Sequence, residues 1–383
     1  MRVAVLGAGY AGVTIGRHLE DTLPSEVEIV VVNDTRHHLV RHEVHRVLRR
    51  PSVADLIEVP LTEVFDRATV VVDRVEEVSP ADERVRLADN GTVHYDYAAV
   101  CLGSETAFYD LPGVREHATP LRDVAHAERV REAFLDVCDT GGRVVVGGGG
   151  LSGIQVAGEL AALRREEGAD VEVVLVEQLD SVAPSFPANF QGAVRDELEA
   201  RDVIVRTETS VVRATADELV LADARLEEDE GLAYDLLVWT GGIRGSDALA
   251  RDRPRVRSDL RFGPSTFVLG DAARVVDADG EAVPASASTA IREARTVASN
   301  LRRLVEHDRE GDADDFAPRL DPYRFDVPGW IVSVGDGAVA QLGPTVLTGP
   351  AAKAMKATVG AGHLTSVGSI RRAVSLVEEE LAF

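Results

Sequence analysis

The sequence predicts an α/β protein in which one plan of strand, glycine turn and helix occurs twice, followed by a small C-terminal α+β region. Two apolar strands, at residues 2–6 and 143–146, each run into a glycine-rich turn with the spacing G-x-G-x-x-G. A third apolar strand, at 265–269, ends in a glycine and an aspartate. Residues 322–345 then alternate apolar and polar side chains, as the strands of a small antiparallel sheet do.

The glycines of the two turns fit the geometry that a dinucleotide requires. The first glycine allows a tight turn, the second lets the backbone approach a pyrophosphate, and the third lets the helix pack close to the strand. The phosphates then meet the helix N-terminus, where free N–H groups favour negative charge. One such turn also occurs as a plain connection, but two predict two Rossmann-like dinucleotide-binding domains. The six glycines are Gly7, Gly9, Gly12, Gly148, Gly150 and Gly153.

The first repeat continues with a helix over about 11–20 and a strand at 27–32. Asp34 lies 22 residues after Gly12, near the usual position of an acid that hydrogen-bonds a ribose hydroxyl. Asn33 is the alternative, because an amide can do the same. Further strands are expected at 69–78, 83–88, 92–95 and from 97 to a break at Gly103.

The second repeat has a helix over 151–166 and a strand over 171–177. That strand ends in Glu177, 24 residues after Gly153. A carboxylate at this position accepts from a ribose 2′-hydroxyl and repels a 2′-phosphate, so it favours NADH over NADPH. The apolar strand from Tyr234 to Gly242 then repeats the plan of 97–106.

These repeats predict the division of the chain. A first dinucleotide-binding domain is expected from 1–118 together with 255–320, and a second from 119–254. Residues 321–383 form the C-terminal region, in which helix is expected from Gly349 on. The acid-rich stretch 306–315 is typical of a solvated linker.

The composition indicates the cellular environment of the protein and the partners it excludes. Acidic residues outnumber basic ones by 65 to 41, giving a formal net charge of −24, and only two lysines occur. Such a surface suits a high-salt cytoplasm, where screening removes most self-repulsion, and it argues against a nucleic-acid partner. Cys101 and Cys138 form no motif, which is typical of free thiols in a reducing cytoplasm. No signal peptide precedes the first strand, and no apolar run is long enough to span a bilayer.

The two glycine turns and the Gly270-Asp271 segment resemble those of the flavoproteins with two dinucleotide-binding domains. Within that group the chain is most similar to the type II NADH dehydrogenases, which are single-subunit NADH:quinone oxidoreductases. The motifs that fall in family order are His38-Leu39, Gly153-Ile-Gln-Val-Ala-Gly-Glu159-Leu, Trp239-Thr-Gly-Gly-Ile-Arg244 and Gly270-Asp271.

The resemblance implies FAD at the first turn, NADH at the second and Asp271 on the ribityl chain of FAD. Gly103, Gly242, Gly270 and Ala290 are the other cofactor contacts expected from it. It further implies hydride transfer from NADH to the flavin and electron transfer on to a quinone, without proton pumping. Two alternatives stay open: reduction of a soluble acceptor such as ferredoxin, a dye or oxygen, and a flavin-bearing redox-sensing or assembly protein.

Three positions depart from the family pattern. Gln155 stands where the family usually has an acid, between NADH and the quinone, and an amide exchanges no protons there. Arg292 and Glu293 stand where the family has a pair of glutamines beside the quinone. The disulfide reductases of this fold need a C-x-x-x-x-C pair near residues 40–50, which this chain lacks.

Residues 37–50 are rich in histidine and arginine. If the segment is helical from residue 40, its histidines share one face, as the ligands of a metal ion could. Cys or carboxylate partners are lacking, so no metal is predicted. The other interpretation is a solvated amphipathic helix. The resemblance separately implies that the segment passes near the flavin, where Arg41 or His42 would steady its reduced, anionic form. The face considered for a metal would consist of His38, His42, His45 and Arg49. Glu159 is expected as a solvated or paired charge on its helix flank.

Residues 337–377 contain no Asp or Glu, so their cations predict a local basic surface. In the resembling family the C-terminal segment docks on the membrane, which implies peripheral contact through 349–383 at the inner face of the cell membrane. The alternative is a helix packed on its own domain or on a second subunit, as in a homodimer. The cations are Lys353, Lys356, Arg371 and Arg372.

Overall fold

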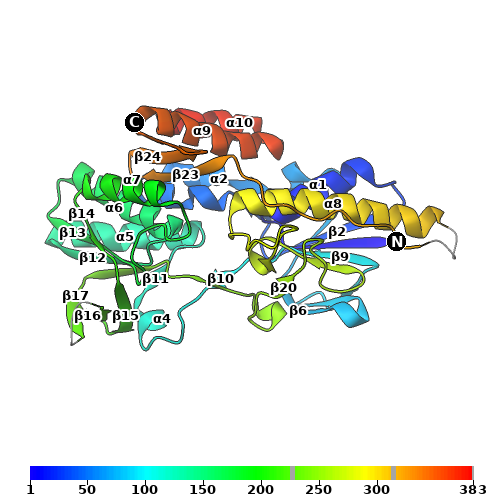
Figure 1. Ribbon diagram of the computed structural model, residues 1–383, viewed down its shortest axis with the longest axis horizontal. Coiled ribbons are helices and arrows are strands. Elements are labelled where there is room, and N and C mark those ends of the chain that lie inside the picture. The colour runs from blue at the N-terminus through cyan, green and yellow to red at the C-terminus, as the bar shows by residue number, and fades with distance from the viewer. Residues whose placement is uncertain (225–228, 312–315, 382–383) are drawn as a thin grey trace.

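The computed structural model describes residues 1–224, 229–311 and 316–381. Figure 1 shows two lobes side by side, with the C-terminal elements lying across both of them. Each lobe is built around a five-stranded sheet. Within the described residues, no helix is long and apolar enough to cross a membrane.

The first lobe has a parallel sheet with the strand order β21-β9-β1-β2-β5. Its central strands are apolar and almost wholly buried, the pattern of a parallel sheet. Helices α1 (Tyr10–Thr22) and α8 (Ala287–Glu310) pack against each other beside it. The strands are β1 (Arg2–Leu6), β2 (Glu28–Asn33), β5 (Thr69–Val72), β9 (Tyr97–Val100) and β21 (Thr266–Val268).

The second lobe repeats this plan with the strand order β11-β18-β12-β13-β14, again parallel. Its helices are α5 (Val124–Thr140), α6 (Leu151–Glu167) and α7 (Ala188–Glu199). The strands are β11 (Thr119–Pro120), β12 (Gly142–Gly147), β13 (Val171–Val176), β14 (Val203–Arg206) and β18 (Leu236–Trp239). In both lobes the strand that leads into a glycine turn therefore has parallel neighbours on both sides, which brings their carboxyl ends together.

Each lobe also carries a three-stranded antiparallel sheet, and one two-stranded ribbon joins the lobes. The first sheet has β6 (Val75–Ser79), β7 (Arg84–Leu87) and β8 (Thr92–His94), and the second has β15 (Thr209–Ala214), β16 (Glu218–Asp223) and β17 (Glu230–Ala233). The ribbon pairs β10 (Glu105–Thr106) with β19 (Ile243–Arg244). Shorter elements are η2 (Pro51–Val53), α2 (Ala54–Ile57), α3 (Leu61–Val64), η3 (Pro80–Asp82), α4 (Val114–His117), η4 (Asp247–Leu249), β20 (Arg255–Val256) and β22 (Arg274–Val275).

The C-terminal region is an antiparallel sheet covered by two helices. The strands are β23 (Gly329–Val334), β24 (Gly337–Leu342) and β25 (Thr345–Thr348), and the helices are α9 (Gly349–Ser366) and α10 (Ile370–Leu381). Strand β23 packs on α6 of the second lobe, and α10 contacts α2 of the first. The C-terminal region thus touches both lobes.

The strand expected over 69–78 is two strands, because Asp73 turns the chain between β5 and β6. Its carboxylate accepts from the main-chain N–H groups of Arg74 at 2.7 Å and Asn90 at 2.8 Å. Two sheets therefore begin where one strand was expected.

The linker expected over 306–315 is helical in its first part. Helix α8 continues to Glu310, and 312–315 lie outside the described residues. The reason is its inner face, where Leu301, Leu304 and Val305 stay buried while the acidic residues face out. The C-terminal strands begin at Gly329, later than the expected 322.

The histidine-rich segment does not form the helical face considered above. His38 lies in strand β3 (His37–Leu39), which pairs with β4 (Glu58–Pro60), and the chain then forms the 3₁₀ helix η1 (Arg41–Leu48). A 3₁₀ helix has three residues per turn, so the α-helical spacing does not apply. Nor is the segment solvated, since Glu43, His45 and Arg46 are buried along with its valines.

Candidate dinucleotide-binding sites

The first glycine of each turn is required by the close approach of two chains. Gly7 has φ of +96°, and a Cβ built on it would lie 2.5 Å from the carbonyl oxygen of Cys101, just beyond β9. Gly148 has φ of +105°, and a Cβ there would lie 2.6 Å from Cα of Gly241, just beyond β18. No other residue fits at either place.

The other glycines complete each cradle. A Cβ on Gly12 or Gly153 would lie 1.8 Å from the carbonyl oxygen of the first glycine in the same turn. Around Gly9 and Gly150, by contrast, no atom lies within 4 Å of the place that a Cβ would take. Both residues cap a helix without a side-chain hydrogen bond. Each turn therefore leaves an open helix N-terminus, which fits a pyrophosphate.

The residues at the ends of β2 and β13 hold the two turns in shape. The Asn33 Oδ1 atom accepts from the N–H of Ala8 at 2.7 Å. The Glu177 carboxylate accepts from the N–H of Gly149 at 2.7 Å and from that of Leu179 at 2.9 Å. Two residues predicted to bind ribose thus bind the turn that precedes the helix.

The ribose contacts themselves stay predictions. Glu177 is buried, but each carboxylate oxygen keeps a lone pair beyond its amide contact. The amide nitrogen of Asn33 donates to the carbonyl oxygen of Thr35 at 3.0 Å, so both ends of this side chain are engaged. Asp34 next to it is exposed.

The loop that carries Asp271 is clamped from two sides. It forms the short 3₁₀ helix η5 (Gly270–Ala272), and Gly270 donates its N–H to Glu293 Oε2 at 2.6 Å. The guanidinium of Arg253 donates to the carbonyl oxygens of Asp271 and Ala273, both at 2.8 Å. Sequence reasoning missed Arg253 as a residue of this site, because its partners lie 18 and 20 residues away.

Glu293 and Ala290 lie one turn apart on the inner side of α8. Burial raises the pKa of Glu293 to about 7, the N–H of Gly270 lowers it, and the nearby charge of Asp271 raises it further. A Cβ on Gly270 would lie 3.4 Å from the Cβ of Ala290, so Ala290 lies against the start of this loop. Glu293 is therefore a support of the Asp271 loop.

Gly103 and Gly242 lie where the chain crosses between the lobes. Both have positive φ, +68° and +149° respectively. The hydroxyl of Tyr109 covers Gly242, 2.0 Å from the place that a Cβ would take. The ribbon of β10 and β19 is closed by an ion pair between Glu105 and Arg244.

His42 is brought beside the first turn, whereas Gln155 lies on the second lobe. The Nδ1 atom of His42 and the hydroxyl of Tyr10, the first residue of α1, lie 2.5 Å apart. Arg41 is exposed, and its charge contributes to lowering the pKa of His38. Gln155 is half-buried on α6. Arg41, His42 and Gln155, the three residues weighed above for a part in the reaction, thus share no contact.

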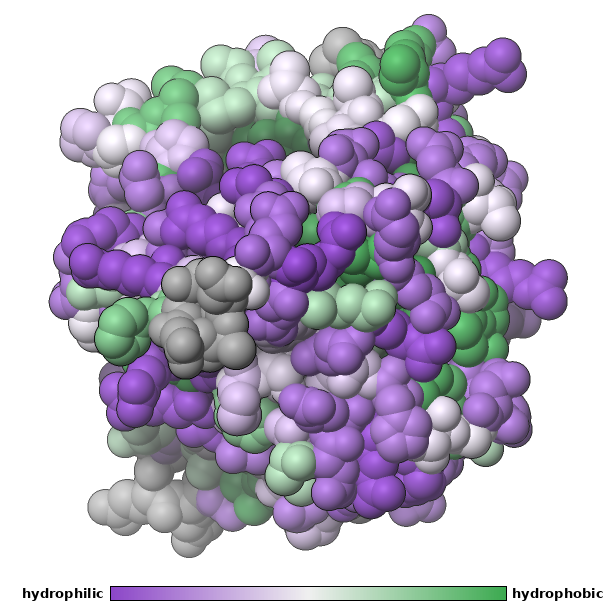
Figure 2. Space-filling view, turned by 90° about the vertical axis from the view of Figure 1, so that its right-hand side faces the viewer, coloured by the Kyte–Doolittle hydropathy of each residue, from purple (hydrophilic) through white to green (hydrophobic). Residues whose placement is uncertain are grey.

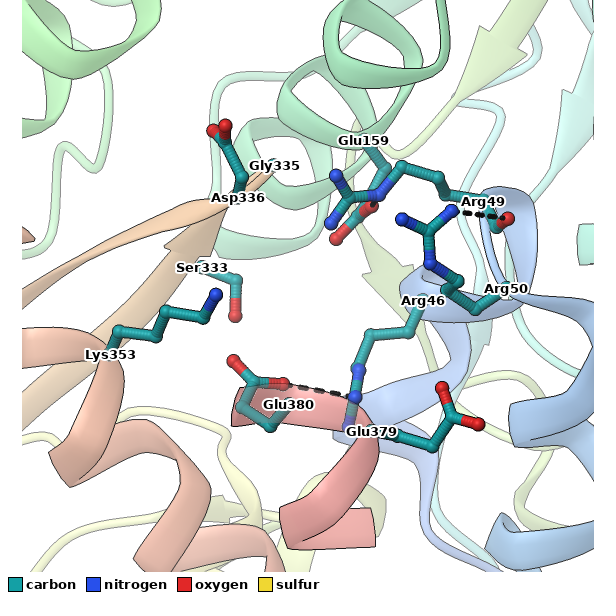
Figure 3. Close-up of a pocket in the computed structure, with 10 residues that line it drawn as sticks. All are labelled: Arg46, Arg49, Arg50, Glu159, Ser333, Gly335, Asp336, Lys353, Glu379 and Glu380. Atoms are coloured by element: carbon teal, nitrogen blue, oxygen red, sulfur yellow. Dashed lines mark hydrogen bonds and ion pairs between the residues drawn. The ribbon is translucent and has the colours of Figure 1, made fainter. Parts of the chain in front are cut away.

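Glu159 was expected as a solvated or paired charge, and it is buried and paired with Arg49. Its carboxylate lies 2.8 Å from Nε of Arg49, and burial raises its pKa to about 7. Figure 3 shows Glu159 of α6 beside Arg49, and both line a polar hollow together with Arg46 and Arg50. On the other side of the hollow, Arg46 pairs with Glu380 of α10 at 3.2 Å. The hollow is where the two lobes and the C-terminal region meet.

The expected basic surface of the C-terminal region is largely absent. Lys356 is buried and forms an ion pair with Glu43 of η1, which is itself buried. Lys353 is half-buried, and Arg372 donates to the main-chain oxygen of Asp55. Of the four cations only Arg371 is exposed.

Among the described residues of α9 and α10, the large hydrophobic side chains that remain exposed are Val359, Ile370 and Val374. On the face drawn in Figure 2, hydrophilic residues cover most of the surface, and hydrophobic residues gather along its upper edge, at the height of α9 and α10.

The two cysteines do not form a disulfide pair. Both are free, and burial raises the pKa of the Cys101 thiol. The described residues also contain no cluster of histidine, cysteine and acidic side chains that could hold a metal ion.

Two parallel sheets with equivalent open turns, and an aspartate loop beside the first, define an oxidoreductase that binds FAD and a pyridine nucleotide. The model of the pyridine nucleotide-disulphide oxidoreductase family matches residues 1–294, and the chain belongs to that family. The predicted fold, enzyme class and cofactor class are thereby confirmed.

Relatives cover most of the chain. A type II NADH:quinone oxidoreductase from Staphylococcus epidermidis is 26% identical over 341 residues, which are 81% of this chain and 84% of that protein. The demethylphylloquinone reductase NdbB from Synechocystis is 26% identical over 377 residues, 92% of this chain and 89% of that protein. The structure of NDH2 from Plasmodium falciparum in complex with NADH has the same fold, with a TM-score of 0.85 at 13% identity, covering 99% of this chain and 98% of that one.

Proposed function

We propose that this protein oxidises NADH and passes the electrons through bound FAD to a quinone, without pumping protons. The observation that carries the proposal is the pair of open helix N-termini at Gly9 and Gly150, each at the end of a parallel strand in its own lobe. The quinone is supported by the relatives, which include a type II NADH:quinone oxidoreductase and a demethylphylloquinone reductase.

We assign FAD to the lobe formed by 1–118 and 255–320, and NADH to the lobe formed by 119–254. The start of α1 would hold the FAD pyrophosphate, Asn33 and Asp34 would serve the adenosine ribose, and Asp271 would bind the ribityl hydroxyls. The start of α6 would hold the NADH pyrophosphate, and Glu177 would serve its ribose. Gly103 and Gly242 allow the chain to pass close to both nucleotides between the lobes.

The bound flavin supplies the ring that accepts hydride and passes on electrons. The residues of the chain hold and orient both nucleotides. Arg253 and Glu293 fix the Asp271 loop from two sides, so that the ribityl chain meets a preorganised acceptor. Gln155, near the start of α6, can form a hydrogen bond, but its amide does not act as an acid or a base. His42, held against Tyr10, is an imidazole beside the first turn.

Glu177 favours NADH over NADPH in this assignment. Its carboxylate is fixed by the N–H groups of Gly149 and Leu179, so it cannot swing away from an incoming 2′-phosphate. A buried, fixed negative charge repels that phosphate more strongly than a mobile one would.

The C-terminal region 349–383 would make a peripheral membrane contact through Val359, Ile370 and Val374, with Arg371 beside them. Membrane association brings the enzyme to a lipid-soluble quinone at the inner face of the cell membrane. The same apolar side chains also fit the contact of a homodimer.

A soluble acceptor such as ferredoxin is the second candidate. It is favoured by the burial of Lys356, which leaves little basic surface for anionic lipid. Catalytic efficiency, kcat/KM, should therefore be compared for a short-chain quinone and for ferredoxin with NADH as donor. A higher value for the quinone supports the proposal, and a higher value for ferredoxin favours the second candidate.

A further inference from the structure

The peptide between Ala8 and Gly9 is held on both sides in the first turn. Ala8 donates its N–H to Asn33 Oδ1 at 2.7 Å, and its carbonyl oxygen lies 2.8 Å from Nδ1 of His38. In a trans peptide the C=O and the following N–H point in opposite directions. Because the Ala8 carbonyl points inward at the buried His38, the N–H of Gly9 points to the open side of the turn.

The hydrogen bonds of His38 fix the proton positions of a second histidine. A carbonyl oxygen only accepts, so Nδ1 of His38 carries the proton and Nε2 of the neutral ring is an acceptor. That Nε2 atom lies 2.8 Å from Nε2 of His363 on α9, which must therefore be the donor. The ring of Tyr10 packs against both imidazoles, at 5.5 and 4.7 Å between ring centres. A continuous relay thus runs from Ala8 to a residue 325 positions after His38.

Burial keeps both imidazoles neutral, as this relay requires. It lowers the pKa of His38 to about 4 and that of His363 to about 2. Two protonated rings would both be donors, and their Nε2 atoms could not bond each other.

The second turn holds the equivalent peptide in another way. Gly149 donates its N–H to Glu177 at 2.7 Å, as Ala8 does to Asn33. Its carbonyl oxygen accepts from the main-chain N–H of Ala183 at 2.8 Å, in the same lobe. The second turn is therefore complete within its own lobe, whereas the first depends on a side chain of the C-terminal region.

We propose that α9 is a part of the FAD site, in which His363 acts as a positioning residue. Through His38 it holds the Ala8–Gly9 peptide in the orientation that presents the Gly9 N–H to the pyrophosphate. This inference rests on the proposal that FAD occupies the first turn. It follows that the affinity for FAD depends on α9 being packed in its place, whereas the affinity for NADH does not.

The test compares FAD affinity in three variants of α9. His363→Leu removes the donor, whereas the amide of His363→Gln can take the place of Nε2–H. Thr365→Leu, at an exposed position of the same helix, is the matched control. FAD release from each purified holoprotein is followed by flavin fluorescence, and NAD⁺ affinity by titration calorimetry. We expect His363→Leu to weaken FAD binding about tenfold, equivalent to about 1.4 kcal/mol, while the other two variants stay near the native value. NAD⁺ affinity should be unchanged in all three.

A second background separates the relay from general damage to α9. The amide of His38→Asn lies where Nδ1 was and donates to Ala8 without help from His363. In that background His363→Leu should leave FAD affinity unchanged. If His363→Leu fails to fold, His363→Asn, whose amide is too short to reach His38, takes its place.

The inference is overturned if FAD affinity is the same with and without the His363 donor, or if the loss is equal in the His38→Asn background. Either result leaves the proposed function intact. Failure of the native protein to bind FAD at all would instead overturn the proposed function.

Discussion

At the scale of single residues, Asn33 and Glu177 show that one position can serve two purposes. Each ends the second strand of its repeat and holds an N–H of the preceding glycine turn, at 2.7 Å in both cases. One is neutral and the other carries a charge. That difference suits a resident cofactor in one lobe and discrimination between NADH and NADPH in the other.

Replacing the charge of Glu177 should change coenzyme preference. In Glu177→Gln we expect the ratio of kcat/KM for NADH to that for NADPH to fall about tenfold, since repulsion of the 2′-phosphate is lost. Steady-state kinetics with both coenzymes measures the ratio. Glu172→Gln, on the exposed side of the same strand, is the control and should leave it unchanged. An unaltered ratio in Glu177→Gln would remove Glu177 from the ribose site.

Glu293 should make stability depend on pH. Its folded pKa of about 7 lies above the ordinary 4.5, so its contribution is present below about pH 4.5 and is lost as pH rises through 7. Glu293→Gln keeps an oxygen acceptor for Gly270 and removes the charge. We expect the two unfolding free energies to differ by less than about 1 kcal/mol at pH 5, and the variant to be more stable by about 2–3 kcal/mol at pH 8. Urea unfolding at the two pH values tests this, and a difference that is independent of pH would contradict it.

At the scale of elements, strands and turns could be predicted where backbone geometry limits the residue type. The glycine turns were found because Gly7 and Gly148 have positive φ and no room for a Cβ. The segment around His38 could not be found in this way, since β4 and α9 decide its conformation from elsewhere in the chain.

The residues that hold the Asp271 loop in place could not be predicted from the sequence, for the same reason. Arg253 and Glu293 reach the Asp271 loop from other elements, and no local spacing marks them. Lys356 is a clear case: its surroundings in sequence predicted a basic surface, but Glu43, 313 residues away, holds it in the interior.

That buried ion pair should anchor α9. Lys356→Met leaves the carboxylate of Glu43 buried without its lysine, and we expect a loss of about 3–5 kcal/mol in unfolding free energy. Lys353→Met, one turn earlier on the same helix, should cost less than about 1 kcal/mol. Urea unfolding followed by tryptophan fluorescence measures both. Equal losses would mean that the pair does not anchor the helix.

At the scale of the whole molecule, three parts meet around charged groups. Arg49 and Arg50 of the first lobe pair with Glu159 and Glu166 of the second at 2.8 and 2.9 Å, beside the hollow that the C-terminal region closes. These ion pairs join the two lobes in addition to the ribbon of β10 and β19.

The net charge of −24 should make the molecule dependent on salt. Because screening reduces self-repulsion among the surface acids, we expect the melting temperature to rise with KCl up to molar concentrations. Differential scanning calorimetry in KCl measures this, and chloride avoids the general stabilisation that sulfate brings. A melting temperature that is constant or falls with KCl would contradict adaptation to a high-salt cytoplasm.

The central claim is that electrons pass from NADH to a flavin bound by the same chain. Anaerobic stopped-flow mixing of the purified protein with NADH, followed by a short-chain quinone, tests it most directly. The account predicts a yellow protein whose flavin absorbance is bleached by NADH within the time of one turnover and restored by the quinone. A protein that takes up no FAD, or a bound flavin that NADH does not bleach, would contradict it.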